Sequence, residues 1–151
     1  MLKLSCNKSF GRQTLEKIAV IELTTNELKL ILADVIKNKS YLIYDEIVTP
    51  INLTKDFEEE NIIKTIVVKE ILNTLTVYKK MIDSLGITEI FAVACDFVKK
   101  AKNQNGFLNE LHSTTNIDFK IITPEEEINF AYTAAINTFN KPKALLINVN
   151  E

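Results

Sequence analysis

The stretch Ile18-Ala19-Val20-Ile21-Glu22-Leu23-Thr24-Thr25-Asn26-Glu27-Leu28-Lys29-Leu30-Ile31-Leu32 decides the fold of this chain. Two apolar, β-branched runs flank the polar residues 24–26, a pattern that predicts a β-hairpin. The first run is apolar on both faces up to Glu22, so we expect its strand to be buried on both sides of a sheet. Glu22 and the hydroxyl and amide groups after it then lie at the rim of the sheet, where α/β folds commonly bind ligands. They suit a phosphate or a metal-bound water, and the alternative is an ordinary hairpin with a solvated turn.

Composition places the chain among globular proteins and excludes several classes. It has 151 residues, of which 46% are apolar and 25% charged, enough for one domain with a core. The net charge of −2 provides no basic stripe for nucleic acid. No apolar run approaches the ~20 residues that span a bilayer, and no apolar signal segment occurs near the N-terminus. Cys6 and Cys95 have no metal-ligand spacing, so we predict a soluble protein of the reducing cytoplasm.

The order of patterns predicts a mixed α/β sheet with helices on both faces. After an arm at residues 1–16, a single domain at 17–151 follows the order β-β-β-α-β-α-β-α-β and opens with a three-stranded antiparallel meander. The strands are expected at 17–36 (the hairpin), 41–48, 90–95, 119–122 and 144–149, and the helices at 58–85, 97–114 with a break near 103–106, and 124–140.

Local signals fix some of these boundaries. Gly86 suits the left-handed residue that follows a helix, and Thr123, Pro124 and Glu126 predict a capping box at the start of the last helix. The apolar run at 144–149 reaches almost to the last residue. We therefore expect an N-terminal domain, or a truncated product, of a longer protein, in which the exposed edge of this final strand favours a homodimer.

Four segments, in this order, resemble one family. They are Ile21-Glu22-Leu23-Thr24-Thr25-Asn26-Glu27-Leu28-Lys29-Leu30, Ala92-Val93-Ala94-Cys95-Asp96-Phe97-Val98-Lys99, Ile122-Thr123-Pro124-Glu125-Glu126-Glu127 and Leu146-Ile147-Asn148-Val149-Asn150. From about Ile18 onward the chain resembles the N-terminal domain of the exopolyphosphatase/guanosine pentaphosphate phosphohydrolase (Ppx/GppA) phosphatases. The resemblance implies an α/β domain of the ribonuclease H-like, actin-like ATPase type.

The first segment resembles the family's phosphate-binding hairpin, D-x-G-S-N. Glu22 stands in place of the aspartate, Thr24 in place of the glycine and Thr25 in place of the serine, whereas Asn26 matches. The resemblance implies that Glu22 holds Mg²⁺ and that residues 24–26 bind phosphate. Thr24 departs from the family in a way that matters, because glycine lets backbone N–H groups approach phosphate oxygens closely.

The other segments carry further implied roles. Lys29 and Lys99 replace family arginines that bind phosphate, which keeps the charge but loses the bidentate fork. Glu126 matches the first glutamate of the family's G-x-E-E-A, which is implicated in deprotonating the attacking water. Asn148 and Asn150 begin a degenerate second phosphate loop, where the family has D-x-G-G-G-S, and an asparagine lacks the charge of that aspartate.

Two functions follow as expectations. The first is hydrolysis of a terminal phosphoanhydride bond in polyphosphate or guanosine pentaphosphate, with Mg²⁺ and with a C-terminal domain that closes the site; residues 1–151 alone are expected to be inactive. The second is a non-catalytic binding or regulatory domain that kept the fold and lost the loops. An actin-like ATPase or sugar kinase shares the fold but fits residues 123–127 less well.

Overall fold

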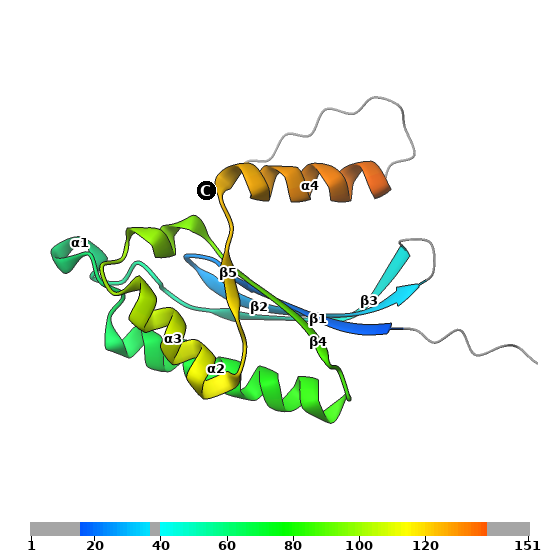
Figure 1. The fold of residues 1–151 in the computed structure, drawn as a ribbon, viewed down its shortest axis with the longest axis horizontal. Helices are drawn as coiled ribbons and strands as arrows, with labels where there is room; N and C mark the ends of the chain where they lie inside the picture. The colour runs from blue at the N-terminus through cyan, green and yellow to red at the C-terminus, as the bar shows by residue number, and fades with distance from the viewer. Residues whose placement is uncertain (1–15, 37–39, 139–151) are drawn as a thin grey trace, which may run out of the picture.

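The computed structural model describes residues 16–36 and 40–138 and contains one five-stranded mixed sheet. The strand order is β3-β2-β1-β4-β5. β2 pairs antiparallel with both β1 and β3, whereas β4 runs parallel to β1 and β5 parallel to β4 (Figure 1). The predicted meander and mixed sheet are confirmed. The strands are β1 (Glu16–Leu23), β2 (Glu27–Ile36), β3 (Ser40–Pro50), β4 (Glu89–Ala94) and β5 (Phe119–Ile121).

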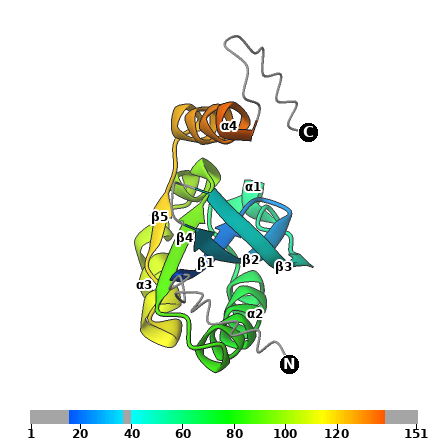
Figure 2. The same cartoon turned by 90° about the vertical axis from the view of Figure 1, so that its right-hand side faces the viewer.

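Helices lie on both faces of the sheet, as predicted. α2 (Thr65–Ser84) and α3 (Gln104–Thr115) cover one face, and α4 (Pro124–Thr138) lies over the other (Figures 1 and 2). The core is on the side of α2 and α3, where alternate β1 residues are fully buried. The expectation that β1 is buried on both sides is wrong for the α4 side. There Val20 and Glu22 stay partly exposed, because among the described elements only α4 covers that face.

The helix expected at 58–85 is in fact two helices. α1 (Phe57–Glu60) ends at Asn61, whose φ of 54° is left-handed and whose N–H donates to the Phe57 carbonyl at 2.8 Å. The next segment is held from elsewhere in the chain, because the Asn103 side chain both accepts from the N–H and donates to the carbonyl of Ile63, each at 2.9 Å. This contact with a residue 40 positions away fixes an extended link before α2 begins.

The other predicted boundaries agree closely with the structure. A break separates a 3₁₀ helix, η1 (Asp96–Lys100), from α3, but it lies at residues 101–103, because residues 104–106 already belong to α3. Gly86 has a φ of 68° after α2. The capping box of α4 is confirmed in both directions: the Glu126 N–H donates to Thr123 Oγ1 at 3.2 Å, and the Thr123 N–H donates to Glu126 Oε2 at 3.0 Å.

Several predictions fall on residues outside the described ranges. They are the arm at 1–16, apart from Glu16 in β1, the final strand at 144–149, and the loop residues Asn148 and Asn150. Within the described ranges, none of the helices is both long enough and apolar enough to cross a membrane.

Candidate functional site

The carboxyl ends of β1, β4 and β5 lie at one edge of the sheet. Leu23 is paired in register with Ala94, and Ala94 with Ile121. Backbone hydrogen bonds extend this alignment into the loops, since the Cys95 N–H donates to the Leu23 carbonyl at 2.9 Å and the Ile122 N–H to the Ala94 carbonyl at 3.0 Å. The hairpin turn, the start of η1 and the start of α4 therefore lie close together, in the position where parallel sheets commonly bind ligands.

The hairpin turn at residues 24–26 is rigidly held. The Thr24 N–H donates to the Glu27 carbonyl at 2.9 Å, which closes the turn. From outside the hairpin, the N–H groups of Ile51 and Leu53 donate to the carbonyls of Asn26 and Thr25, each at 2.9 Å. The loop after β3 thus holds the backbone of the turn in place.

A cavity of about 470 Å³ lies at this edge, and we call it the turn cavity. Five of the residues predicted for the site line it: Glu22, Thr24, Thr25, Asn26 and Lys29. The complete lining is Glu22, Leu23, Thr24, Thr25, Asn26, Glu27, Lys29, Val93, Cys95, Phe97, Ile122 and Glu127. The structure thus brings the predicted phosphate residues of the hairpin together and places the start of α4 opposite them.

The Thr24 side chain accepts hydrogen bonds from two backbone N–H groups of the turn. Its Oγ1 accepts from the N–H of Glu27 at 3.1 Å and from the N–H of Asn26 at 3.3 Å. These are backbone donors of the kind that a glycine-containing loop directs at phosphate oxygens. Here the hydroxyl of Thr24 satisfies them from within the protein.

Lys29 is surrounded by carboxylates. Its Nζ lies 3.1 Å from Glu27, 3.8 Å from Glu22 and 3.9 Å from Glu46. The hydrogen bond with Glu27, reinforced by the three negative charges, raises the pKa of Lys29. The carboxylates of the turn cavity (Glu22, Glu27 and Glu127) therefore outnumber its single ammonium, and a phosphate would need an additional cation there.

Glu126 has its carboxylate engaged at the helix start. Besides the capping bond from Thr123, it accepts a 2.7 Å hydrogen bond from Lys120 Nζ. These two bonds, with a weaker contribution from Lys99, lower the pKa of Glu126. A lowered pKa makes this carboxylate a weaker proton acceptor. Its neighbour Glu127, and not Glu126, is among the residues that line the turn cavity.

Lys99 does not join the residues of the turn cavity. Its Nζ lies 2.7 Å from Asp96 Oδ1 within η1. Its charge contributes to the lowered pKa of Glu126.

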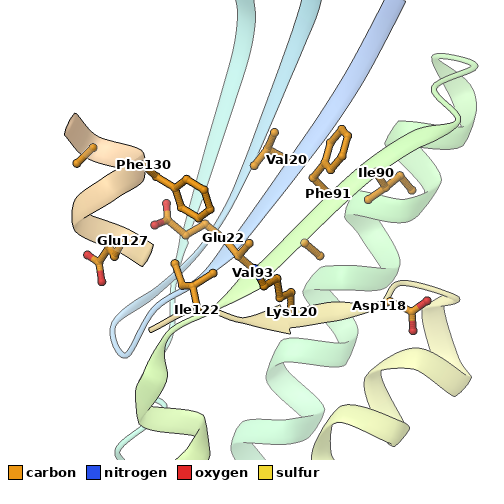
Figure 3. Close-up of a pocket in the computed structure, with 12 residues that line it drawn as sticks. Val20, Glu22, Ile90, Phe91, Val93, Asp118, Lys120, Ile122, Glu127 and Phe130 are labelled. Carbon is orange, nitrogen blue, oxygen red and sulfur yellow. The ribbon is translucent and has the colours of Figure 1, made fainter. Parts of the chain in front are cut away.

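A second cavity, of about 740 Å³, adjoins the first beneath α4, and we call it the α4 cavity. Figure 3 shows Phe130 extending from α4 toward the sheet, while Val20, Phe91 and Val93 come from the strands below. Glu22, Val93, Ile122 and Glu127 line both cavities. The two cavities are therefore neighbouring parts of one recess between the sheet edge and α4.

Sequence reasoning missed several lining residues, of which Glu127 matters most. The capping box carried a signal for it. Because the side chain of Glu126, at position N3, turns back toward Thr123, the next glutamate along the helix points in a different direction. Cys95 and Phe97 also line the turn cavity, and burial raises the pKa of the Cys95 thiol. The Cys95 side chain is partly exposed.

The residues present fit a magnesium ion only in combination with a phosphate ligand. Within residues 16–36 and 40–138 there is no group of three or more histidine, cysteine, aspartate or glutamate side chains placed to hold a metal. Mg²⁺, however, is commonly bound by one or two carboxylates together with phosphates and water. Glu22 and Glu127, which line both cavities, provide that kind of donor.

Comparison with known proteins finds matches to the fold of this chain. The model of the Ppx/GppA phosphatase family matches residues 33–150. A Ppx/GppA family member from Aquifex aeolicus superposes with a TM-score of 0.79 at 26% identity, covering 84% of this chain and 41% of its own. An exopolyphosphatase from Cytophaga hutchinsonii shares the fold, with a TM-score of 0.69 at 19% identity over 76% of this chain and 36% of its own. No curated protein matches the chain by sequence.

The chain spans about two fifths of the length of these solved structures. The family match nevertheless covers most of the chain, including β4, β5 and the start of α4, whereas β1 and the hairpin turn precede the matched residues. This protein belongs to the Ppx/GppA phosphatase family.

Proposed function

We propose that this chain forms one wall of a site that hydrolyses a terminal phosphoanhydride bond, in an exopolyphosphatase-type reaction on polyphosphate or guanosine pentaphosphate. The supporting observation is that the turn at residues 24–26 and Glu127 at the start of α4 line one cavity. Phosphoryl transfer needs mainly positioning and charge neutralisation, and a rigid polar recess at a sheet edge is suited to both.

The proposed roles follow from the positions of the side chains. Thr25 and Asn26 bind phosphate oxygens, and Lys29 supplies positive charge from the neighbouring strand. Glu127 orients and deprotonates the attacking water, whereas Glu126 positions the helix start. Glu22 would hold Mg²⁺ together with the substrate, and the ion would neutralise charge on the phosphate oxygens.

Other parts of the proposal rest on the family resemblance. Residues 17–151 would be the N-terminal domain, with a short arm before it and a second domain that completes the cleft; Asn148 and Asn150 would begin its second phosphate loop. The solved relatives are more than twice as long as this chain, which supports that organisation. The role of Lys99 as a phosphate ligand stays a prediction, as does the homodimer. The free thiol of Cys95 is compatible with the proposed location in the reducing cytoplasm.

The test is phosphate release from polyphosphate with Mg²⁺ by the intact protein. Removing a general base costs on the order of 10²–10⁴ in rate, and this is the loss expected for Glu127→Gln. Glu126→Gln is the matched control, because glutamine also completes a capping box, and it should retain most of the rate. A larger loss in Glu126→Gln would return the catalytic role to Glu126, and equal wild-type rates in both would remove both residues from the mechanism.

One observation favours the second candidate, a binding or regulatory domain without catalysis. The hydroxyl of Thr24 already accepts the two N–H groups that a phosphate loop would offer. Calorimetric titration with polyphosphate, guanosine polyphosphates and ATP separates the candidates when combined with the rate assay. Tight binding with no phosphate release would support the non-catalytic domain.

A further inference from the structure

The loop that follows β3 contacts both the hairpin turn and η1. We call residues 51–63, which include α1, the bridging segment. Figure 1 shows α1 at the end of the sheet where β1 and β2 are joined. At the start of the bridging segment, the N–H groups of Ile51 and Leu53 donate to the carbonyls of the turn. Its later residues contact η1, where Cys95 and Phe97 line the turn cavity opposite the hairpin. The bridging segment therefore connects two walls of that cavity.

Two contacts join the middle of the bridging segment to the region of η1. Phe57 is buried, and its ring lies against the ring of Phe97 with the two centroids 4.5 Å apart. Four residues later, the Asn61 carbonyl accepts a 2.8 Å hydrogen bond from the Lys102 N–H. Phe97 is among the residues that line the turn cavity, whereas Phe57 is not. Phe57 therefore acts on the cavity through its contact with Phe97.

The end of the bridging segment is held by a side chain. The Asn103 amide accepts from the N–H and donates to the carbonyl of Ile63, each at 2.9 Å, and Ile63 is buried. Without this amide, both backbone groups lose their partner, which disfavours the observed arrangement of the segment. Asn103 itself is not among the residues that line the turn cavity or the α4 cavity. Any effect of Asn103 on a ligand must therefore pass through the residues that it holds.

The bridging segment is internally connected between its two ends. The Phe57 N–H donates to the Thr54 carbonyl at 3.0 Å, and the Asn61 N–H donates to the Phe57 carbonyl at 2.8 Å. Leu53 is fully buried in the core. Coupling between separated positions is carried by such continuous chains of hydrogen bonds and packed side chains. Loss of the contact at Ile63 should therefore loosen the hydrogen bonds that hold the hairpin turn.

We propose that Asn103 is a positioning residue for the turn cavity, because it fixes the bridging segment that sets the hairpin turn against η1. Asn103 contacts no ligand and takes no part in the chemical step. Its effect on affinity rests on the proposed phosphate function of the turn, whereas its effect on the backbone of the turn does not.

Calorimetric titration of the intact protein with inorganic tripolyphosphate and Mg²⁺ measures the effect on affinity. Asn103→Ala should weaken binding by about tenfold, because the ligand must then order a loosened segment, and fixing the backbone of one residue costs about this factor. Phe57→Leu keeps a large apolar side chain but removes the ring that contacts Phe97, so it should weaken binding too.

Ile82→Val is the matched control for a general loss of stability. Ile82 is fully buried in the last turn of α2, which leads to the amino end of β4, away from the turn cavity. Removing a methylene group there destabilises the fold. Because Ile82 does not hold the bridging segment, the affinity for tripolyphosphate should stay at the wild-type value.

Amide hydrogen exchange tests the link without reference to phosphate. In Asn103→Ala, the N–H groups of Ile51 and Leu53 should exchange at least about fivefold faster than they do in Ile82→Val, because the segment that carries them is less constrained. Coupling in binding free energy is reciprocal. Tripolyphosphate with Mg²⁺ should therefore slow the exchange of the Ile63 N–H in the wild type.

The outcomes separate this inference from the proposed function. If Asn103→Ala binds tripolyphosphate as tightly as wild type does, or if Ile82→Val weakens binding equally, the positioning role is wrong and the phosphate site remains. If the wild type binds no tripolyphosphate, the proposed phosphate function fails, and the exchange of Ile51 and Leu53 decides the positioning role alone. Faster exchange in Asn103→Ala supports that role, and exchange equal to that of Ile82→Val overturns it.

Discussion

Thr24 is the residue at which this chain departs most clearly from a phosphate-binding loop. Its hydroxyl accepts the N–H groups of Asn26 and Glu27, and removing it should present both donors to a ligand. A hydrogen bond to a charged group contributes about 1.5–3 kcal/mol, so Thr24→Gly should tighten Mg²⁺-tripolyphosphate binding by roughly tenfold or more in a calorimetric titration. The same change should lower the free energy of unfolding by about 1 kcal/mol, because glycine gains more freedom in the unfolded chain.

Thr24→Ser is the matched control for this prediction. Serine keeps the hydroxyl and should leave both the affinity and the stability close to those of the wild type. If Thr24→Gly binds no better than Thr24→Ser, the N–H groups of the turn do not contribute to a phosphate site.

The hydrogen bonds of Glu126 predict that the free energy of unfolding depends on pH. The hydrogen bonds from Lys120 and Thr123 lower the pKa of Glu126 in the folded protein below the ordinary glutamate value. The carboxylate therefore stabilises the fold at pH values above that ordinary value, and the stabilisation is lost as the pH falls through the lowered pKa. Urea unfolding should show Glu126→Gln to be less stable than wild type at pH 7, with the difference disappearing in acid.

Lys120→Met provides an independent check, since it removes the first cause of the lowered pKa of Glu126. The pH dependence that separates wild type from Glu126→Gln should shrink in this background. A difference that stays constant from pH 7 into acid would show that the ion pair is not its source.

At the scale of elements, replacing two glycines by alanine should change the free energy of unfolding in opposite directions. Gly86 ends α2 with a φ of 68°, and Gly106 lies inside α3; a Cβ added at either would meet nothing within 4 Å. Gly86→Ala forces alanine into a left-handed conformation, which costs about 1–2 kcal/mol. Gly106→Ala should instead stabilise by about 0.5–1 kcal/mol, because alanine is the better helix former. Urea unfolding of the two variants measures both effects, and a shared sign would contradict the assignment.

Elements specified by their own sequence could be predicted, and those specified by distant contacts could not. The hairpin turn, the left-handed Gly86 and the capping box of α4 depend on neighbouring residues, and all three are found. The separation of α1 from α2 depends on Asn103, which lies at the start of α3 and forms two hydrogen bonds with the backbone of Ile63. No periodicity in residues 58–85 reveals that contact.

The same division applies to the candidate site. The hairpin residues were predicted because one continuous stretch carries them, and Glu22, Thr24, Thr25, Asn26 and Lys29 do line one cavity. The opposing wall combines β4, β5 and α4, and which glutamate of α4 faces inward depends on how the helix is seated over the sheet. Phe91 and Phe130 become neighbours of the site only through that seating.

At the scale of the whole molecule, the sheet is covered unevenly. α2 and α3 bury one face, while the α4 side keeps an apolar cavity, and a further hollow of about 360 Å³ lies near β3 between Ile31, Tyr41 and Ile43. Large uncovered apolar surface on a small domain commonly marks an interaction site. Among the described residues this apolar surface is uncovered, which makes it a candidate surface for association between copies of the chain.

β3 is the edge at which we expect that association to occur. In the described sheet β3 pairs only with β2, and its consecutive residues Tyr41, Leu42, Ile43 and Tyr44 are 42–58% exposed. An apolar edge strand offers unpaired backbone groups to another chain, and a lysine on such an edge opposes pairing. Size-exclusion chromatography with light scattering should therefore show a mass that rises with concentration for the wild type and stays closer to the monomer for Leu42→Lys.

Ile66→Lys changes a similarly exposed apolar residue on α2 and should behave as wild type. If both lysine variants dissociate the assembly equally, general surface charge is responsible, and the edge of β3 has no special role.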